Sequence, residues 1–155
     1  MTSLPLQTIA AALGQTDCSD KREIRILLTD SRKLTFAEET LFFALTTPKR
    51  DAHRFIPQLY SRGVRAFVVS EAAQFPTGDF PDATFLTVSD TLEALRTIGR
   101  LCRNRLTMPV IGITGSNGKT TTKELLKAFL SRLGKTFATE GNYNNHLGVP
   151  MTLLN

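Results

Sequence analysis

Cysteine and histidine are scarce in this chain of 155 residues, which contains two of each. Cys18 and Cys102 lack the close spacing of a metal site or a redox pair, so we expect two free thiols, as in a protein of the reducing cytoplasm. His53 and His146 lie in separate segments and make no metal-binding pair. Because His53 precedes the apolar face of an expected helix, the sequence favours a structural role for it over a catalytic one.

Long apolar runs are absent as well. No stretch approaches the ~20 residues that cross a membrane, and residues 1–13 lack the basic region and long apolar core of a signal peptide. Internal repeats and low-complexity tracts are also missing. With 41% hydrophobic residues the chain has the composition of a globular protein, and we expect a cytoplasmic location.

Aromatic residues are missing from the most basic part of the chain. The net charge is +5, and four arginines lie on one expected helix at 91–105, namely Arg96, Arg100, Arg103 and Arg105. Without interleaved aromatic residues for base stacking, this helix is better explained by a solvated face than by a nucleic-acid site. The net positive charge of the chain also suits a protein that binds anionic nucleotide substrates.

Expected strands and helices alternate along the sequence, which indicates the α/β fold class. The strands are expected at 25–29, 40–45, 66–70 and 84–88, and the helices at 4–13, 51–62 and 91–105. Ser3 and Asp90 are expected to cap the first and third helices, and Gly14 and Gly63 to end the first and second. Pro109 ends the third helix, so we expect one domain at 1–106 and the beginning of another at 107–155.

A glycine-rich segment just after this boundary carries the clearest chemical signal. The apolar residues 110–113 lead into a tight turn, and Lys119 and Thr120 open an expected helix at 120–133. A strand, a loop and a helix N-terminus in this order bind phosphate, because backbone N–H groups and the helix dipole face the anion. Lys119 can reach the β- and γ-phosphates, and the Thr120 hydroxyl can bind Mg²⁺. We therefore expect an ATP site, with Lys119 as its catalytic residue, formed by Gly115, Ser116, Asn117, Gly118, Lys119, Thr120 and Thr121.

The loop departs from the general phosphate-loop pattern at one position. That pattern has a glycine five residues before Gly118, where this chain has Ile113. A purely structural corner is the alternative interpretation, and Gly-Lys-Thr at a helix start argues against it. The run Thr-Gly-Ser-Asn-Gly-Lys-Thr at 114–120 resembles the loop of the Mur ligases and of their relative folylpolyglutamate synthase, which lacks the same glycine. These ATP-dependent enzymes activate a carboxylate as an acyl phosphate and then form an amide bond.

The first domain extends the resemblance. An Asp-Ser-Arg turn at 30–32, an apolar run at 41–45 and Asp-Ala-His at 51–53 follow the order found in the UDP-binding N-terminal domain of Mur ligases. Taken alone, Asp-Ser-Arg is a common Asx-type turn. The resemblance implies that Ser31 and Arg32 bind the UDP part of the substrate, and an arginine can grip a pyrophosphate in bidentate fashion.

A third segment, at 139–150, is rich in asparagine and glycine. It resembles the corresponding segment of the Mur ligase branch that adds D-alanyl-D-alanine, which implies that Asn142, Asn144 and Asn145 bind substrate. Carboxamides suit uncharged hydrogen bonding beside a crowded anionic centre. One departure is the sequence Thr-Thr-Pro at 46–48, where the family usually has a glycine, so we carry over no binding residue from that loop.

Together these segments imply an ATP-dependent ligase of peptidoglycan precursor synthesis that adds D-alanyl-D-alanine to UDP-MurNAc-tripeptide. The implied cofactors are ATP and Mg²⁺, and the implied parent is a monomer that acts on small molecules and binds no nucleic acid. Two alternatives stay open: a sister Mur ligase that adds a single amino acid, and a non-catalytic module that keeps the nucleotide loop. The roughly fifty residues after the boundary supply one expected strand at 110–113, one helix and a short strand near 136–138. These are too few for a complete phosphate-loop sheet, so we expect a truncated second domain and no activity from this stretch alone.

Overall fold

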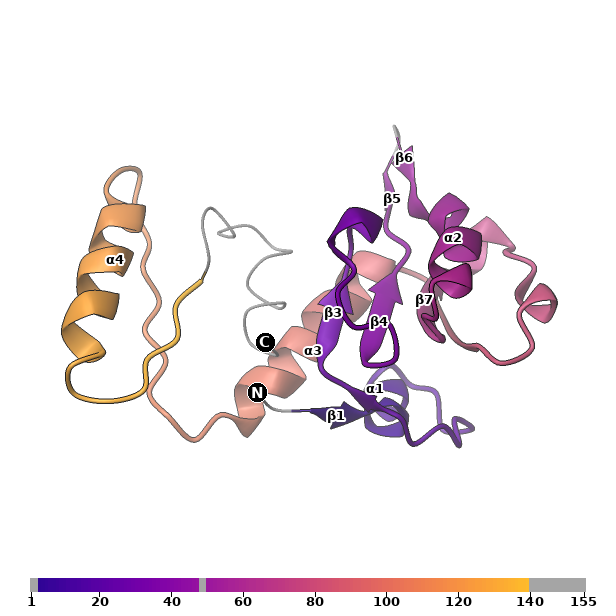
Figure 1. Ribbon diagram of the computed structural model, residues 1–155, viewed down its shortest axis with the longest axis horizontal. Helices are drawn as coiled ribbons and strands as arrows, with labels where there is room; N and C mark the ends of the chain where they lie inside the picture. The colour runs from indigo at the N-terminus through magenta and orange to yellow at the C-terminus, as the bar shows by residue number, and fades with distance from the viewer. Residues whose placement is uncertain (1–2, 48–49, 140–155) are drawn as a thin grey trace.

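The computed structural model describes residues 3–47 and 50–139, and Figure 1 shows an α/β domain followed by a separate helical segment. Four parallel strands form the central sheet, in the order β3-β4-β7-β8. They are β3 (Ile26–Leu28), β4 (Thr40–Phe43), β7 (Ala66–Ser70) and β8 (Thr84–Val88). Every residue of β4 is buried, as expected for an inner strand of a parallel sheet covered on both faces.

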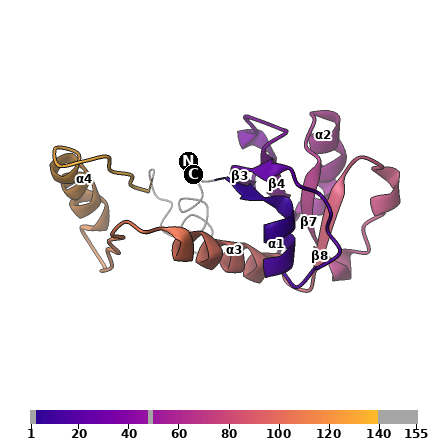
Figure 2. The same cartoon turned by 90° about the horizontal axis from the view of Figure 1, so that it is seen from below.

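Helices cover both faces of this sheet (Figure 2). α1 (Leu6–Ala12) and α3 (Thr91–Arg105) pack on one face, and α2 (Ile56–Ser61) packs on the other. Successive residues of a strand point to opposite faces, so Leu41 belongs to the core under α1 and α3 and Phe42 to the core under α2. The sheet therefore separates two hydrophobic cores, and the α/β fold class predicted from the sequence is confirmed.

Short elements complete the fold. Two antiparallel pairs flank the sheet, one of β1 (Leu4–Pro5) with β2 (Glu23–Ile24) and one of β5 (Thr46–Thr47) with β6 (Arg50–Asp51). Four 3₁₀ turns connect the larger elements: η1 (Ser31–Lys33), η2 (Ala52–Phe55), η3 (Glu71–Ala73) and η4 (Thr77–Asp79). No helix within residues 3–47 and 50–139 has the length and apolarity needed for a membrane span.

Several element boundaries within residues 3–106 agree with those predicted from the sequence. β7, β8 and α3 have the predicted bounds, and the Asp90 carboxylate caps α3 by accepting hydrogen bonds from two backbone N–H groups at 2.7 and 3.1 Å. The first helix starts later than predicted, at Leu6 with Pro5 as its N-cap instead of Ser3, because residues 4 and 5 pair with β2. The helix predicted from residue 51 begins as the 3₁₀ turn η2.

The segment after the boundary differs more from the prediction. α4 (Lys119–Leu130) is present, but the strands expected at 110–113 and 136–138 do not form. Val110 and Ile111 are 43% and 59% exposed, because a strand needs a neighbour and no part of the described chain pairs with this one. Large apolar side chains on and after α4 are also exposed, among them Leu125, Phe129, Leu133 and Phe137.

Gly63, which follows the C-cap residue of α2, is a position where a side chain is costly. Its φ is +96°, in the left-handed region that favours glycine, and an added Cβ would lie 3.3 Å from the Ala37 Cβ. We expect Gly63→Ala to lower the free energy of unfolding by about 1–3 kcal/mol, measured by urea denaturation. Gly78→Ala is the control, since an added Cβ there meets nothing within 4 Å. Equal losses in the two variants would contradict the prediction.

Candidate functional site

Two of the predicted motifs meet at the carboxyl end of the sheet. The 30–32 turn follows β3, and the 51–53 run follows β4 by way of the β5–β6 hairpin. Ser70, the last residue of β7, donates its backbone N–H to His53 Nε2 at 3.0 Å, which places the second motif at the same edge. Ligands of open α/β sheets bind outside the carboxyl ends of the strands, so this edge is the candidate ligand site of the first domain.

Arg32 is oriented by its neighbour Asp30. The Asp30 carboxylate accepts hydrogen bonds from Arg32 Nε at 2.9 Å and Nη2 at 2.6 Å, and from the Arg32 backbone N–H at 3.2 Å. The side-chain hydrogen bond, helped by the charge of Asp30, raises the pKa of the guanidinium. The Arg32 side chain is nevertheless 76% exposed, so it forms a fixed cation that an anionic ligand can reach from solvent.

Ser31 lies at the centre of the same turn and is buried. Its carbonyl accepts a hydrogen bond from Arg62 Nη1 at 3.1 Å, which links the turn to the end of α2. No sequence motif indicates Arg62, because a contact between residues 31 positions apart leaves no local pattern. The turn is therefore stabilised by two side chains: Asp30, which precedes it in sequence, and Arg62, which lies at the end of α2.

His53 has both ring nitrogens engaged within the fold. Nδ1 lies 2.6 Å from Asp51 Oδ1, and Nε2 accepts the Ser70 N–H, so the neutral ring carries its proton on Nδ1 and donates it to Asp51. The backbone N–H of His53, followed by its ring, lowers the pKa of the Asp51 carboxyl against the opposing effect of burial. The His53 side chain is 5% exposed. These contacts favour the structural role that the sequence predicts for His53.

The Lys119 side chain folds back onto the backbone of the glycine-rich loop. Lys119 Nζ donates hydrogen bonds to the Gly115 carbonyl and, at 3.2 Å, to the Ser116 carbonyl. The two loop glycines have positive φ, +145° at Gly115 and +77° at Gly118, the N-cap of α4. The ammonium group is therefore placed at the loop, next to the first turn of the helix.

The start of α4 suits an anionic ligand. The first N–H groups of a helix have no acceptor within it, no side chain caps α4, and its first turn contains no acidic residue. Thr120 and Thr121 are exposed beside this end. Within the described ranges no three His, Cys, Asp or Glu side chains gather as a metal site. Asn142, Asn144 and Asn145, also predicted to bind substrate, lie outside the described residues.

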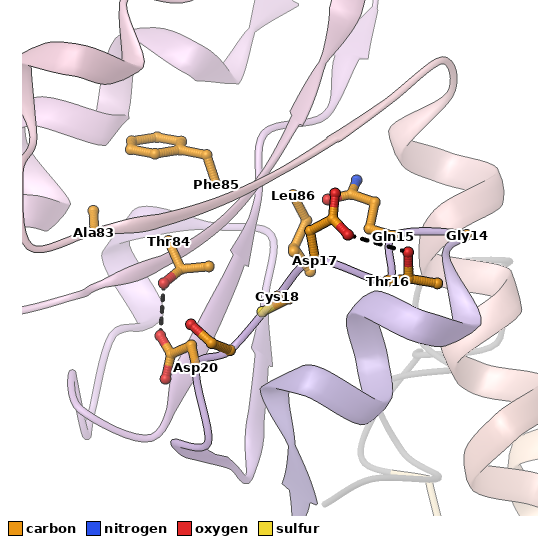
Figure 3. Close-up of a pocket in the computed structure, with 11 residues that line it drawn as sticks. Gly14, Gln15, Thr16, Asp17, Cys18, Asp20, Ala83, Thr84, Phe85 and Leu86 are labelled. Atoms are coloured by element: carbon orange, nitrogen blue, oxygen red, sulfur yellow. Dashed lines mark hydrogen bonds between the residues drawn. The ribbon is translucent and has the colours of Figure 1, made fainter.

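A cavity of about 600 Å³ lies elsewhere, between the loop at 14–20 and the first part of β8 (Figure 3). Asp20 closes one end by accepting a hydrogen bond from Thr84 Oγ1 at 2.6 Å and pairing with Arg22 at 2.9 Å. Burial raises the pKa of Asp20, but the hydrogen bonds from Thr84 and Arg22 outweigh it and lower the pKa overall. The partners of Asp20 are thus structural, and the cavity contains none of the residues predicted to bind ligand.

Comparisons with known proteins identify the family. Residues 113–155 match the Mur ligase middle domain. The UDP-N-acetylmuramoyl-tripeptide–D-alanyl-D-alanine ligase of Synechocystis sp. is 42% identical over 142 residues, which cover 92% of this chain and 30% of that protein. The crystal structure of MurF from Acinetobacter baumannii is similar with a TM-score of 0.83 and 37% identity, over 99% of this chain and 33% of that one.

A further solved structure carries a nucleotide. The MurF ligase of Thermotoga maritima in complex with ADP is similar with a TM-score of 0.68 and 28% identity, over 84% of this chain and 29% of that one. The chain spans about a third of the length of these relatives. Sequence and structure agree, and the chain belongs to the Mur ligase family.

Proposed function

We propose that this chain is part of an ATP-dependent ligase that adds D-alanyl-D-alanine to UDP-MurNAc-tripeptide in peptidoglycan precursor synthesis. The observation that carries the proposal is the loop at 114–120, where Lys119 lies over the loop carbonyls at the uncapped start of α4. The names of the relatives from Synechocystis sp. and Acinetobacter baumannii support the D-alanyl-D-alanine-adding branch.

The proposal assigns substrate binding and ATP binding to two different domains. Residues 1–106 hold the UDP-linked substrate, and residues 107–155 begin the ATP-binding domain. The distribution of buried residues supports this division, because both hydrophobic cores are built from residues up to Cys102 and α4 contributes none. The proposed parent is a cytoplasmic monomer that acts on small molecules. Arg96 and Arg100 pair with Glu93 at 3.2 and 2.9 Å, which favours a solvated face of α3 over a nucleic-acid site.

ATP, when bound, supplies the phosphoryl group that activates the substrate carboxylate. The chain's own part is to bind and orient the phosphates through the backbone N–H groups of the loop, at Gly115, Ser116, Asn117, Gly118, Lys119, Thr120 and Thr121. Lys119 neutralises charge on the transferred group, and Thr120 contributes a ligand to Mg²⁺. Such a reaction depends on positioning and charge neutralisation, which a preformed loop with a fixed cation provides.

Ser31 and Arg32 hold the UDP part at the carboxyl edge of the sheet, and Asn142, Asn144 and Asn145 contact substrate. The exposed guanidinium of Arg32, held by Asp30, supports the first part of this assignment. The three asparagines rest on the resemblance of their sequence to the D-alanyl-D-alanine-adding ligases.

Arg32→Ala tests the UDP site in the chain itself. Loss of a charge-assisted hydrogen bond costs about 1.5–3 kcal/mol, so we expect UDP to bind roughly 10- to 150-fold more weakly, as measured by calorimetry. Arg103→Ala is the matched control, because it removes the same charge from an exposed position on α3. If wild type and Arg32→Ala bind UDP equally well, Arg32 is not part of the site.

A further inference from the structure

Two arginines lie at η1, the turn that follows β3. Arg32 belongs to the turn itself, and Arg62 reaches it from the end of α2 by donating from Nη1 to the Ser31 carbonyl at 3.1 Å. That carbonyl is part of the peptide group that joins Ser31 to Arg32, so the Arg62 guanidinium lies within one peptide group of the Arg32 backbone. Both arginines are exposed, so solvent has access to each of them.

The two guanidinium groups differ in the charge that faces them. Arg32 donates two side-chain hydrogen bonds to the Asp30 carboxylate, at 2.9 and 2.6 Å, so a negative charge lies against its positive one. Arg62 donates to a neutral carbonyl, and within residues 3–47 and 50–139 it forms no ion pair. The Asp30–Arg32 pair is therefore close to neutral, whereas Arg62 adds an uncompensated positive charge to the turn.

Arg62 keeps the donors that an anion needs. A guanidinium has five N–H donors, and the bond to Ser31 uses Nη1. Lys33, the last residue of η1, is another cation at this turn, but an ammonium group on a flexible stem acts as a point charge. A planar guanidinium presents paired N–H groups to two oxygens of one anion, so Arg62 is the better suited of the two to bind a phosphate group.

The base of the Arg62 side chain is fixed as well. Arg62 is the C-cap residue of α2, and its backbone N–H donates to the carbonyls of Gln58 and Leu59 at 3.3 and 3.1 Å. The next residue, Gly63, packs closely on the connection between β3 and β4, because an added Cβ would lie 3.3 Å from the Ala37 Cβ. A side chain held at both ends has little conformational entropy left to lose when a ligand binds.

We propose that Arg62 is a second cation of the candidate ligand site, and that it binds the diphosphate of the UDP-linked substrate together with Arg32. This inference rests on the proposed function, because it takes the ligand at η1 to be UDP. The carboxylate of Asp30 repels a diphosphate that approaches Arg32, and the uncompensated charge of Arg62 offsets that repulsion. Arg32 thus supplies directed hydrogen bonds, and Arg62 supplies net positive charge.

The test compares the binding of UDP and of uridine to the full-length ligase by calorimetry, with excess ADP present to occupy the phosphate loop. We expect Arg62→Gln to weaken UDP binding at least about tenfold and to change uridine binding less than about twofold, because uridine lacks the diphosphate. Arg62→Lys, which keeps the charge without the paired N–H groups, should fall between Arg62→Gln and wild type. Arg103→Gln removes an exposed arginine from α3 and should bind both ligands as wild type does.

A salt titration gives a readout that a purely structural role of Arg62 would not change. Salt screens interactions between exposed charges, so raising its concentration should weaken UDP binding more in wild type than in Arg62→Gln. Thermal unfolding of each variant checks that the fold is kept.

Unchanged UDP binding in Arg62→Gln would overturn the inference. Equal losses for UDP and uridine would overturn it too, because they would mean that Arg62 only holds the turn in shape. If Arg62→Gln does not fold, Arg62→Met is measured in its place, and the same outcomes decide. A wild-type enzyme that binds UDP but forms no amide bond contradicts the proposed ligase activity alone, because calorimetry measures binding without turnover.

Discussion

Lys119→Ala in the full-length ligase should lower kcat by about 10²-fold or more and leave the fold nearly unchanged. Lys119 Nζ lies over the Gly115 and Ser116 carbonyls at the start of α4, where a nucleotide phosphate would meet it. A cation there stabilises charge as it moves from the γ-phosphoryl group to the leaving ADP, so its effect falls on the transition state. No residue of α4 is fully buried, so the loss of this side chain should cost no more than about 0.5 kcal/mol of stability.

Steady-state kinetics on the folded variant measure this effect, with thermal unfolding as the check on structure. Lys127→Ala removes the same charge from the same helix and should keep a normal kcat. A near-normal kcat in Lys119→Ala would mean that the loop is only a structural corner, and the proposed function would fall with it.

The largest loss of stability is expected at His53. His53→Ala should lower the free energy of unfolding by about 3–5 kcal/mol, because it leaves a cavity and an unpaired Ser70 N–H. The ring is buried and joins Asp51 to the end of β7 through both nitrogens. Urea denaturation measures the loss, and amide hydrogen exchange should show faster exchange at Ser70.

Gln58→Ala is the control for His53→Ala, since Gln58 is exposed on α2 and should cost no more than about 0.5 kcal/mol. A similarly small loss in His53→Ala, with unchanged exchange at Ser70, would show that the ring does not hold the carboxyl edge of the sheet together.

The parts of the fold that depend on local sequence could be predicted. β7 and β8 are short apolar runs between turn residues, and Asp90 caps α3 through its own neighbours, so their positions follow from a few adjacent residues. The strand predicted at 110–113 did not form, because a strand depends on a neighbour as well as on its own apolar residues. For the four strands of the central sheet and for α3, local pattern gave the correct element type, because the described chain also supplied the packing partner.

In the candidate sites, too, only the features that depend on adjacent residues could be predicted from the sequence. The Ser31 turn and the Lys119 loop could be found as motifs, because each motif is contiguous in sequence. Contacts between distant positions could not be predicted. Arg62 Nη1 reaches the Ser31 carbonyl across 31 positions, and Lys123 Nζ reaches the Thr139 carbonyl across 16. Arginine and lysine side chains are long and make no periodic pattern with distant carbonyl groups, so only the folded backbone shows which carbonyl lies within reach.

The loop at 14–20 also bears on how copies of this chain behave at high concentration. β8 is an edge strand of the sheet, and an open edge invites a strand from another molecule to pair with it. Gln15 Nε2 donates to the Thr87 carbonyl at 2.6 Å, and Asp20 holds Thr84 at the other end of the strand. A second molecule would have to displace this loop before it could add a strand to β8, so the loop opposes edge-to-edge aggregation.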